Sequence, residues 1–204
     1  MRCTTNQSSI QNRLYSIEFV AIGASLGGLN ALKTIVSFLP DNFSTPIAIV
    51  LHRQASPQDY LTEALQKVTT IKVCEAIDKN EICEGTITVA PNDYHLLVDG
   101  ECYALSLDEK VSLARPSIDV LFESVADRYG PAALAIVLTG GSHDGADGMA
   151  SIIARGGQVM VQDPKTAEAP IMPEAAIAST LTDKIYPLYE LGPQLLHHCM
   201  ARNL

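Results

Sequence analysis

A serine in a glycine-rich turn is the residue of this sequence best suited to covalent chemistry. Ser25 is the centre of the segment GASLG, residues 23–27, which fits the pattern G-x-S-x-G. In that pattern, small residues let the backbone turn sharply between a strand and a helix, so that the serine hydroxyl stands above the edge of a sheet. The backbone N–H groups just after such a serine point outward from the start of the helix, where they can stabilise an oxyanion. The segment therefore indicates a nucleophilic serine.

Two other roles are open for this turn. Glycine-rich turns between a strand and a helix often bind phosphate, and some only reverse the chain. The glycines follow G-x-x-x-G-G, which differs from the dinucleotide pattern G-x-G-x-x-G, and Leu29 stands where the Walker pattern needs a lysine. Taken alone, the segment leaves a nucleophile, a phosphate site and a structural turn as alternatives.

A histidine and an aspartate occupy positions equivalent to that of the serine. Ser25, His52 and Asp144 each follow the carboxyl end of a separate apolar run, and we interpret these runs as buried strands. In an open parallel sheet the carboxyl ends of the strands share one edge, where ligands bind. An imidazole can take the proton of a serine hydroxyl, and a carboxylate fixes the tautomer of the imidazole and stabilises the cation that it becomes. The pattern therefore predicts Ser25 as nucleophile, His52 as general base and then acid, and Asp144 as the orienting carboxylate.

The other histidines are weaker candidates for the base. His95 falls in a predicted hairpin and His197 and His198 in a terminal helix, where a solvated or buried structural imidazole is usual. His143 directly precedes the aspartate, and a carboxylate cannot easily orient its own neighbour. On position alone, His52 can also be a structural histidine at the end of a strand. The chain order Ser, His, Asp differs from the order Ser, Asp, His of the common α/β-hydrolases, so that fold is not favoured.

The elements that carry these residues alternate between strands and helices. The expected strands are residues 19–22, 47–51, 132–138, 158–162 and 184–188, and the expected helices are residues 29–39, 57–68, 116–129, 173–179, 189–200 and one around Met149. Between residues 72 and 107, short strand-like pieces are divided by turn residues, with a tight turn at Asp99-Gly100, and they predict an antiparallel hairpin or meander at one edge of the sheet. The sequence therefore predicts an α/β fold with a doubly wound, mostly parallel sheet flanked by helices and a small antiparallel hairpin region.

Length and composition indicate one catalytic domain preceded by a tail. With 204 residues, 47% of them hydrophobic, the chain can bury a sizeable core. Residues 1–16 are polar and have no hydrophobic centre of the kind found in signal peptides. We therefore expect a flexible N-terminal tail over residues 1–16, a domain over residues 17–204 and a cytoplasmic location.

Charge and hydropathy argue against several partners. A formal net charge of -9 argues against nucleic acid or an anionic membrane as the main partner. The longest apolar runs are far shorter than the roughly 18 residues that a membrane span needs, which predicts no membrane insertion. Five cysteines without a C-x-x-C pair fit reduced thiols and no zinc site, and we expect neither a metal nor an organic cofactor.

Several separate segments resemble one known family. They are AIGASLGG, IAIVLH, TVAPNDYHL, RPSIDVLFESVA, VLTGGSHDGADGM and VQDPKTAEAPIMPEAA, in this order between Phe19 and Leu196. Together they resemble the catalytic domain of the CheB chemotaxis protein-glutamate methylesterases. The resemblance implies a doubly wound sheet and places the family's catalytic serine, histidine and aspartate on Ser25, His52 and Asp144. It also implies hydrolysis of glutamate γ-methyl esters, and deamidation of glutamine, on the cytoplasmic helices of chemoreceptors.

The chain departs from the family pattern close to these residues. Leu26 follows the serine where the family usually has threonine, and Arg53 follows the histidine where an apolar methionine is usual. Gly141 and Ser142 replace a Met-Gly pair in the turn before the aspartate. The oxyanion is expected to bind main-chain N–H groups near Leu26 and Gly141, which these changes retain. The three catalytic positions stay intact, and substrate preference and rate are left open.

Control of the activity and two rival functions are also open. In the family, a phosphorylatable receiver domain commonly precedes the esterase domain and covers its active site. Here only residues 1–16 precede the first strand, and they contain no aspartate or glutamate. We therefore expect an esterase that is constitutively open or controlled by a separate regulatory protein. The rival functions are a catalytically weak module that binds receptor helices or another signalling protein, and a hydrolase of a different ester.

Overall fold

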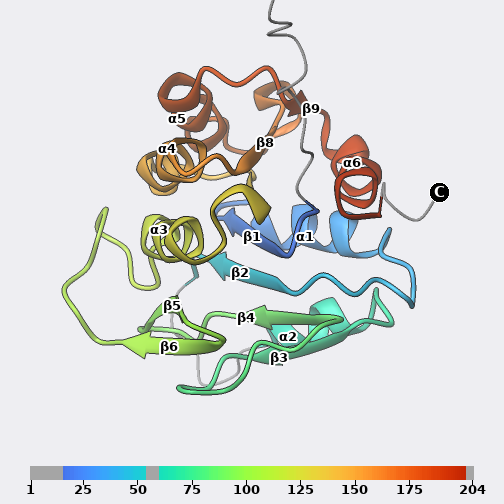
Figure 1. The fold of residues 1–204 in the computed structure, drawn as a ribbon. Coiled ribbons are helices and arrows are strands. Elements are labelled where there is room, and N and C mark those ends of the chain that lie inside the picture. The colour runs from blue at the N-terminus through green and yellow to red at the C-terminus, as the bar shows by residue number, and fades with distance from the viewer. Residues whose placement is uncertain (1–15, 54–59, 201–204) are drawn as a thin grey trace, which may run out of the picture.

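Seven strands form one parallel sheet in the computed structural model, which describes residues 16–53 and 60–200 (Figure 1). The strands are β1 (Phe19–Ala24), β2 (Ile47–Leu51), β3 (Lys72–Glu75), β4 (Thr86–Val89), β7 (Ala133–Val137), β8 (Gln158–Gln162) and β9 (Ile185–Tyr186). Their order across the sheet is β3-β4-β2-β1-β7-β8-β9, and each neighbouring pair is parallel. This arrangement confirms the predicted α/β fold with its mostly parallel sheet.

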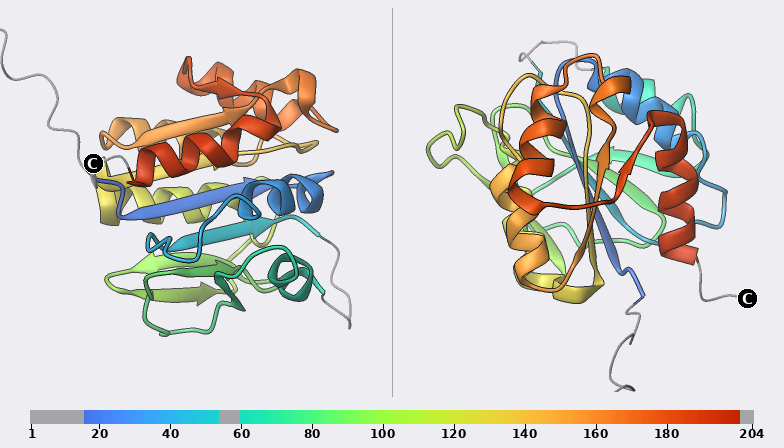
Figure 2. Two further views of the ribbon diagram at one scale, coloured as in Figure 1. Left: turned by 90° about the vertical axis from the view of Figure 1, so that its right-hand side faces the viewer. Right: turned by 90° about the horizontal axis from the view of Figure 1, so that it is seen from above.

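The central strands are buried on both faces, as their uninterrupted apolar sequences predict. Along β1, Val20 and Ile22 belong to one apolar core, whereas Phe19 and Ala21 belong to another. Because successive side chains of a strand point to opposite faces, the two cores lie on opposite sides of the sheet. The first core includes residues of α1 (Gly28–Val36), α2 (Leu61–Gln66) and α6 (Leu188–Met200), and the second includes residues of α3 (Ile118–Tyr129), α4 (Ala146–Ala154) and α5 (Ile171–Thr180). Figures 1 and 2 show helices covering the sheet on both sides.

The chain reverses its direction of winding at β1. From β1 it passes to β2, β3 and β4 on one side, and after α3 it returns to β7 on the other side of β1. The carboxyl ends of β1, β2 and β7 are therefore neighbours at the switch point, where ligands bind in open α/β sheets. Ser25, His52 and Asp144 follow these three strands in the chain.

The meander expected over residues 72–107 is only partly present. β5 (His95–Asp99) and β6 (Cys102–Ser106) do form an antiparallel hairpin, and Gly100 has a φ of 62° in the turn between them. In contrast, β3 and β4 are parallel strands of the main sheet, so the prediction of an antiparallel meander is wrong for them.

The segment between β3 and β4 explains this difference. Its turn residues do not close a hairpin, because their backbone pairs with β6 instead, where the N–H of Tyr103 donates to the carbonyl of Asn80 over 2.8 Å. This detour returns the chain to the end of the sheet at which β3 began, and β4 enters between β2 and β3 in the parallel direction. Each residue of β4 is buried, as expected for an interior strand.

The helices begin close to where the sequence places them. α3 has Ser117 as its N-cap, and the Ser117 side chain accepts from the N–H of Val120. α5 begins at Ile171, earlier than the expected start at Pro173. A proline is tolerated anywhere in the first turn of a helix, because the nitrogens there have no hydrogen-bond partner within the helix, so Pro173 does not have to be the first residue.

Two expectations fall mainly outside the described residues. The start of the helix expected over residues 57–68 is one, and the tail expected over residues 1–16 is the other, apart from Ser16. The division of the chain at residue 17 therefore stays a prediction. Among the helices of the described ranges, none has the length and apolar character needed to cross a membrane.

Candidate active site

Ser25 and His52 lie next to one another because β1 and β2 are in register. Ala24 of β1 pairs with Leu51 of β2, and the N–H of His52 donates to the carbonyl of Ala24 over 3.0 Å. The next residue on the first strand is Ser25, and on the second it is His52. Both residues line the same two hollows at the carboxyl edge of the sheet. The structure therefore brings the predicted nucleophile and the predicted base to one place.

Two glycines let the chain pass tightly around Ser25. Gly27, at the start of α1, has a φ of 77°, a conformation that residues with a side chain rarely adopt. On the neighbouring loop, a β-carbon added to Gly140 would lie 2.9 Å from the β-carbon of Ser25 and 2.5 Å from Cε of Met172. The turn of the serine and the loop after β7 can approach this closely only because Gly140 has no side chain.

The imidazole of His52 is held by Asp144. Its Nε2 lies 2.7 Å from Oδ2 of Asp144, whose side chain is fully buried, whereas 17% of the His52 side chain is exposed. Since a carboxylate only accepts, Nε2 carries a proton and Nδ1 is the nitrogen left to accept another. In the part of the chain that the structure describes, Ser25 and His52 share no hydrogen bond. The structure thus contains a hydrogen-bonded pair of His52 and Asp144, and Ser25 lies beside this pair.

Hydrogen-bond donors surround Asp144 at the start of α3. Its Oδ1 accepts from the Ser117 hydroxyl over 2.8 Å and from the N–H of Asp119 over 3.0 Å. Oδ2, which contacts His52, also accepts from the N–H of Ile118 over 2.7 Å. Burial by itself raises the pKa of Asp144, but the hydrogen bonds from His52 and from these donors outweigh burial and hold the pKa below its ordinary value. Asp144 is therefore a carboxylate at neutral pH.

A second buried carboxylate, Asp119, mirrors this arrangement at the start of α4. Its Oδ1 accepts from the N–H groups of Gly145 and Gly148, each over 2.8 Å, and its Oδ2 accepts from the Ser112 hydroxyl over 3.1 Å. Asp144 thus accepts from N–H groups at the start of α3, where Asp119 lies. Asp119 in turn accepts from N–H groups at the start of α4, just after Asp144. Burial, and to a smaller extent the nearby Asp144, raise the pKa of Asp119 to about 6. Asp119 was not predicted, because an acidic residue in the first turn of a helix is ordinarily exposed.

Thr139 holds the turn that carries Ser25. Its carbonyl accepts from the N–H of Ser25 over 2.9 Å, and its hydroxyl donates to the carbonyl of Leu26 over 2.9 Å. The same hydroxyl accepts from the N–H of Ala169 over 2.8 Å. The N–H of Thr139 donates to Oε1 of Gln162 over 2.9 Å, and both side chains are buried. Thr139 thus holds the N–H of Ser25 and the carbonyl of Leu26, on either side of the peptide that joins these two residues, and Gln162 holds Thr139. Neither Thr139 nor Gln162 was predicted, since their partners are distant in sequence.

The two main-chain groups expected to bind an oxyanion differ in their surroundings. The N–H of Leu26 directly follows the serine, and among the described residues it donates to no acceptor. The N–H of Gly141 also has no acceptor in the described ranges, but Gly141 is exposed and lines neither hollow, whereas Ser142 lines one of them. The expected oxyanion-binding roles of Leu26 and Gly141 therefore stay predictions.

Two hollows meet at these residues and form an open cleft. Their volumes are about 550 Å³ and about 540 Å³. The residues that line both are Ser25, Leu26, His52 and Arg53. The first hollow continues along the loop between β6 and α3, and the second continues along α1 and α2. Within residues 16–53 and 60–200, no three His, Cys, Asp or Glu side chains are grouped so that they could hold a metal ion.

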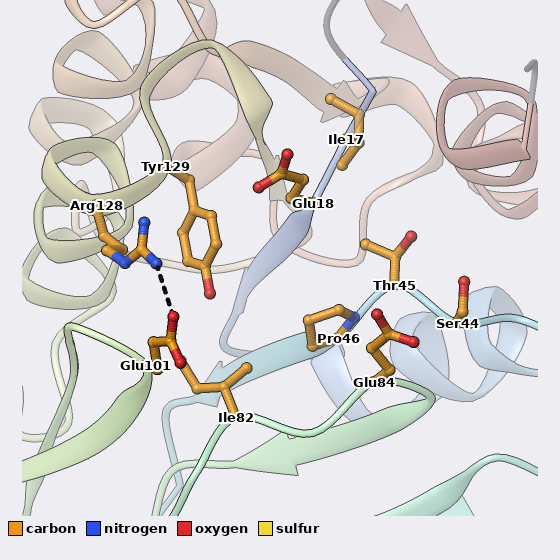
Figure 3. Close-up of a pocket in the computed structure, with 10 residues that line it drawn as sticks. All are labelled: Ile17, Glu18, Ser44, Thr45, Pro46, Ile82, Glu84, Glu101, Arg128 and Tyr129. Atoms are coloured by element: carbon orange, nitrogen blue, oxygen red, sulfur yellow. Dashed lines mark ion pairs between the residues drawn. The ribbon is translucent and has the colours of Figure 1, made fainter.

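A further hollow of about 450 Å³ lies at the opposite edge of the sheet, where β1 and β2 begin (Figure 3). Its charged lining residues are Glu18, Glu84, Glu101 and Arg128. Figure 3 shows the Arg128 guanidinium facing Glu101, with 3.8 Å between the nearest nitrogen and oxygen. Because neither the predicted nucleophile nor the predicted base lines this hollow, we place the candidate active site at the carboxyl edge.

Comparison with a solved structure defines the class of protein to which this fold belongs. The crystal structure of the CheB methylesterase catalytic domain of Thermotoga maritima superposes with a TM-score of 0.85 at 30% sequence identity. The match covers 90% of this chain and 99% of that domain. The fold is therefore that of a CheB catalytic domain.

Sequence comparison gives the family. The CheB methylesterase family model matches residues 20–195, and the chain belongs to that family. A relative from Leptospira interrogans, named "Putative protein-glutamate methylesterase/protein-glutamine glutaminase", is 42% identical over 86% of this chain and 91% of its own length. The protein-glutamate methylesterase/protein-glutamine glutaminase of Maricaulis maris is 34% identical over 91% of this chain and 47% of its own length. The chain thus spans nearly all of the first relative and about half of the second.

Proposed function

We propose that this chain is a serine esterase that hydrolyses the γ-methyl esters of glutamate residues in chemoreceptors. The observation that carries the proposal is the hydrogen bond between His52 and the buried Asp144, next to the turn of Ser25. A histidine oriented by a carboxylate is the group that activates a serine for acyl transfer. The names of the relatives support this substrate and a second reaction, the deamidation of glutamine.

In the first step, Nδ1 of His52 accepts the proton of the Ser25 hydroxyl while Oγ attacks the carbonyl carbon of the ester. Nε2 keeps its proton and its hydrogen bond to Asp144, whose carboxylate stabilises the imidazolium. The hydrogen bond between Ser25 and Nδ1 forms as the substrate binds, since catalytic hydrogen bonds often tighten only in the complex.

The tetrahedral intermediate then loses methanol. The bond from carbon to the methoxy oxygen breaks, the imidazolium gives its proton to that oxygen, and an acyl-enzyme remains on Ser25. A water molecule then gives its proton to His52 and attacks the acyl carbon, and the serine oxygen leaves with the proton. The products are methanol and glutamate, and with glutamine as substrate ammonia leaves in place of methanol. No step needs a metal or an organic cofactor.

The charge on the former carbonyl oxygen is stabilised by the N–H groups of Leu26 and Gly141. Thr139 holds the N–H of Ser25 and the carbonyl of Leu26, which flank the Leu26 N–H at the start of α1, where the helix dipole also favours an anion. Around Gly141, leaving out its two chain neighbours, no atom lies within 4 Å of the position of a β-carbon, so no other part of the chain crowds this turn on that side.

The substrate implies where the protein acts. Methylated glutamates of chemoreceptors lie on their cytoplasmic helices, so we propose a cytoplasmic location, with neither nucleic acid nor membrane insertion in the reaction.

The test is release of methanol from a methylated chemoreceptor fragment by the purified chain and by the variant Ser25→Ala. The variant should lose at least about 10³-fold in kcat, because loss of a nucleophile in such a site costs several orders of magnitude, while its circular dichroism stays that of the parent. Ser151→Ala is the matched control, since Ser151 lines neither hollow. Activity of the Ser25 variant within about tenfold of the parent would refute the proposal.

The rival functions give different results. A covalent serine probe followed by peptide mapping should label Ser25, and an activated ester should give a burst of product. A catalytically weak module that binds receptor helices shows neither label nor burst. A hydrolase of a different ester shows both but releases no methanol from the receptor.

A further inference from the structure

The loop between β6 and α3 forms one rim of the cleft and presents an apolar side chain to solvent. Leu113 is 93% exposed, the largest fraction among the large apolar side chains of the described residues. It lines the hollow that also contains Ser25 and His52. Its φ is 64°, a conformation that costs energy for a residue with a side chain. Leu113 therefore stays in this exposed position only because the rest of the loop holds it there.

Arg115 is one of the groups that hold the loop. Its Nη1 donates to the carbonyls of Leu107 over 2.8 Å and Asp108 over 3.0 Å. Its Nη2 lies 2.9 Å from Oδ1 of Asp93, in the segment just before β5. The guanidinium thus ties both ends of the loop to the hairpin.

Further contacts hold the loop to α3. The buried His95 accepts from the N–H of Ser117 at Nδ1 over 3.2 Å, so Nε2 donates to the carbonyl of Glu109 over 3.0 Å. Ser112, adjacent to Leu113, donates to Asp119 over 3.1 Å. The rim is therefore preformed, and a preformed surface loses little entropy when a partner binds.

The hollow under this rim is cationic although the chain is acidic. Arg53, Lys110 and Arg115 line it, and no aspartate or glutamate is among its lining residues in the described part of the chain, although Asp93 outside the hollow pairs with Arg115. The whole chain carries a formal net charge of -9. Lys110 is exposed and has no ion-pair partner within the described ranges. A local excess of cations beside a nucleophile favours a substrate with negative charge near the reacting group.

The shape of the cleft favours a polypeptide rather than a small ester. The two hollows, of about 550 Å³ and about 540 Å³, share Ser25 and His52, so a bound segment can cross the nucleophile and contact both. A single methyl ester occupies only the place where they meet. The remaining surface is available to residues that flank the esterified glutamate.

We propose that Lys110 and Leu113 form a substrate-recognition surface for an acidic, amphipathic protein segment. Lys110 pairs with a carboxylate near the esterified glutamate, and Leu113 packs against an apolar side chain of the same segment. The inference rests on the proposed function, because the surface has this role only if Ser25 is the nucleophile.

The test compares two substrates, a methylated chemoreceptor fragment and p-nitrophenyl acetate, with the variants Lys110→Glu and Leu113→Ala. Each variant should lose at least tenfold more kcat/KM on the protein than on the small ester, and most of the loss should be in KM. Raising the salt concentration should raise the KM of the parent for the protein, and Lys110→Glu should show a weaker salt dependence, since the charge that is screened is gone.

Matched controls are Leu181→Ala and Lys79→Glu. Leu181 is 87% exposed with a φ of 52°, Lys79 is exposed with a φ of 66°, and neither lines the cleft. Both controls should stay within about twofold of the parent on both substrates. Equal losses on the two substrates, or losses on the protein no larger than those of the controls, overturn the inference while the proposed function stands. A parent enzyme that hydrolyses neither substrate overturns the proposed function and the inference with it.

Discussion

Replacement of Thr139 by valine should affect catalysis and stability together. Thr139→Val keeps the shape of the side chain and removes its hydroxyl, which donates to the carbonyl of Leu26 over 2.9 Å and accepts from the N–H of Ala169 over 2.8 Å. The N–H of the buried Ala169 and the carbonyl of Leu26, in a partly buried contact, then lose a partner, at about 1–3 kcal/mol for each group that is fully buried. With partial relaxation, we expect the free energy of unfolding to fall by about 2–4 kcal/mol.

The catalytic effect of the same change follows from the position of the Leu26 peptide. Its N–H is a proposed oxyanion donor, and complete loss of such a donor costs about 10²–10³ in kcat. Because Thr139→Val releases the carbonyl of Leu26, and so loosens this residue without removing its N–H, we expect a fall of roughly tenfold to hundredfold in kcat with little change in KM. The assay is steady-state hydrolysis of the methylated receptor fragment, with urea unfolding measured on the same preparations.

The conservative variant Thr139→Ser is the control. It retains the hydroxyl and loses only a methyl group, so it should keep kcat within about threefold of the parent and lose about 1 kcal/mol of stability. The reasoning is refuted if Thr139→Val is folded and its kcat stays within threefold of the parent. It is also refuted if the serine variant loses as much kcat as the valine variant.

The remaining predictions concern three residues close to the cleft. The pKa of Asp119 is raised to about 6 in the folded protein, above a value near 4 in the unfolded chain. The folded protein therefore holds this proton more tightly, and the free energy of unfolding should fall as pH rises from about 4 to about 6. Asp119→Asn should remove that slope, and urea titrations from pH 4 to 7 that run parallel for parent and variant would contradict this. Gly141→Met should preserve or raise turnover, because no atom lies within 4 Å of a β-carbon there and its φ is not in the left-handed range. A folded variant without activity would show that the cleft needs this space. Gly140→Ala should lower both the melting temperature and kcat, because its β-carbon meets Met172 and Ser25, and a variant equal to the parent in both measurements would show that the loop can shift.

The edge of the sheet at which the site lies could be predicted from sequence for a simple reason. Apolar runs that are buried on both faces are recognisable as strands, and Ser25 and His52 directly follow two of them. In a parallel sheet, the residues after paired strand ends must be neighbours. The contact between His52 and Asp144 needs more than this rule, because β1 lies between β2 and β7, a loop separates Asp144 from the end of β7, and donors from α3 hold the carboxylate.

The parts that could not be predicted depend on contacts between distant segments. β3 and β4 are short, and the turn residues between them suit a hairpin as well as the detour that pairs them with β6. Thr139, Gln162 and Asp119 are polar residues whose importance comes from buried partners elsewhere in the chain. No local pattern distinguishes them from exposed residues of the same type.

The mutual capping of α3 and α4 has a consequence for how the protein opens. If the first turn of α3 opens, Asp144 loses the donors Ser117, Ile118 and Asp119 at once, and Asp119 is drawn away from the N–H groups at the start of α4. The two helix starts therefore form one cooperative unit, and their amide hydrogens should exchange with solvent through a single shared opening. In that open state the carboxylate that contacts His52 has lost the three donors that hold it in place. With the proposed roles of Ser25, His52 and Asp144, an opening smaller than global unfolding should lower the activity, and a partner that separates these two helices should inhibit the enzyme without touching Ser25.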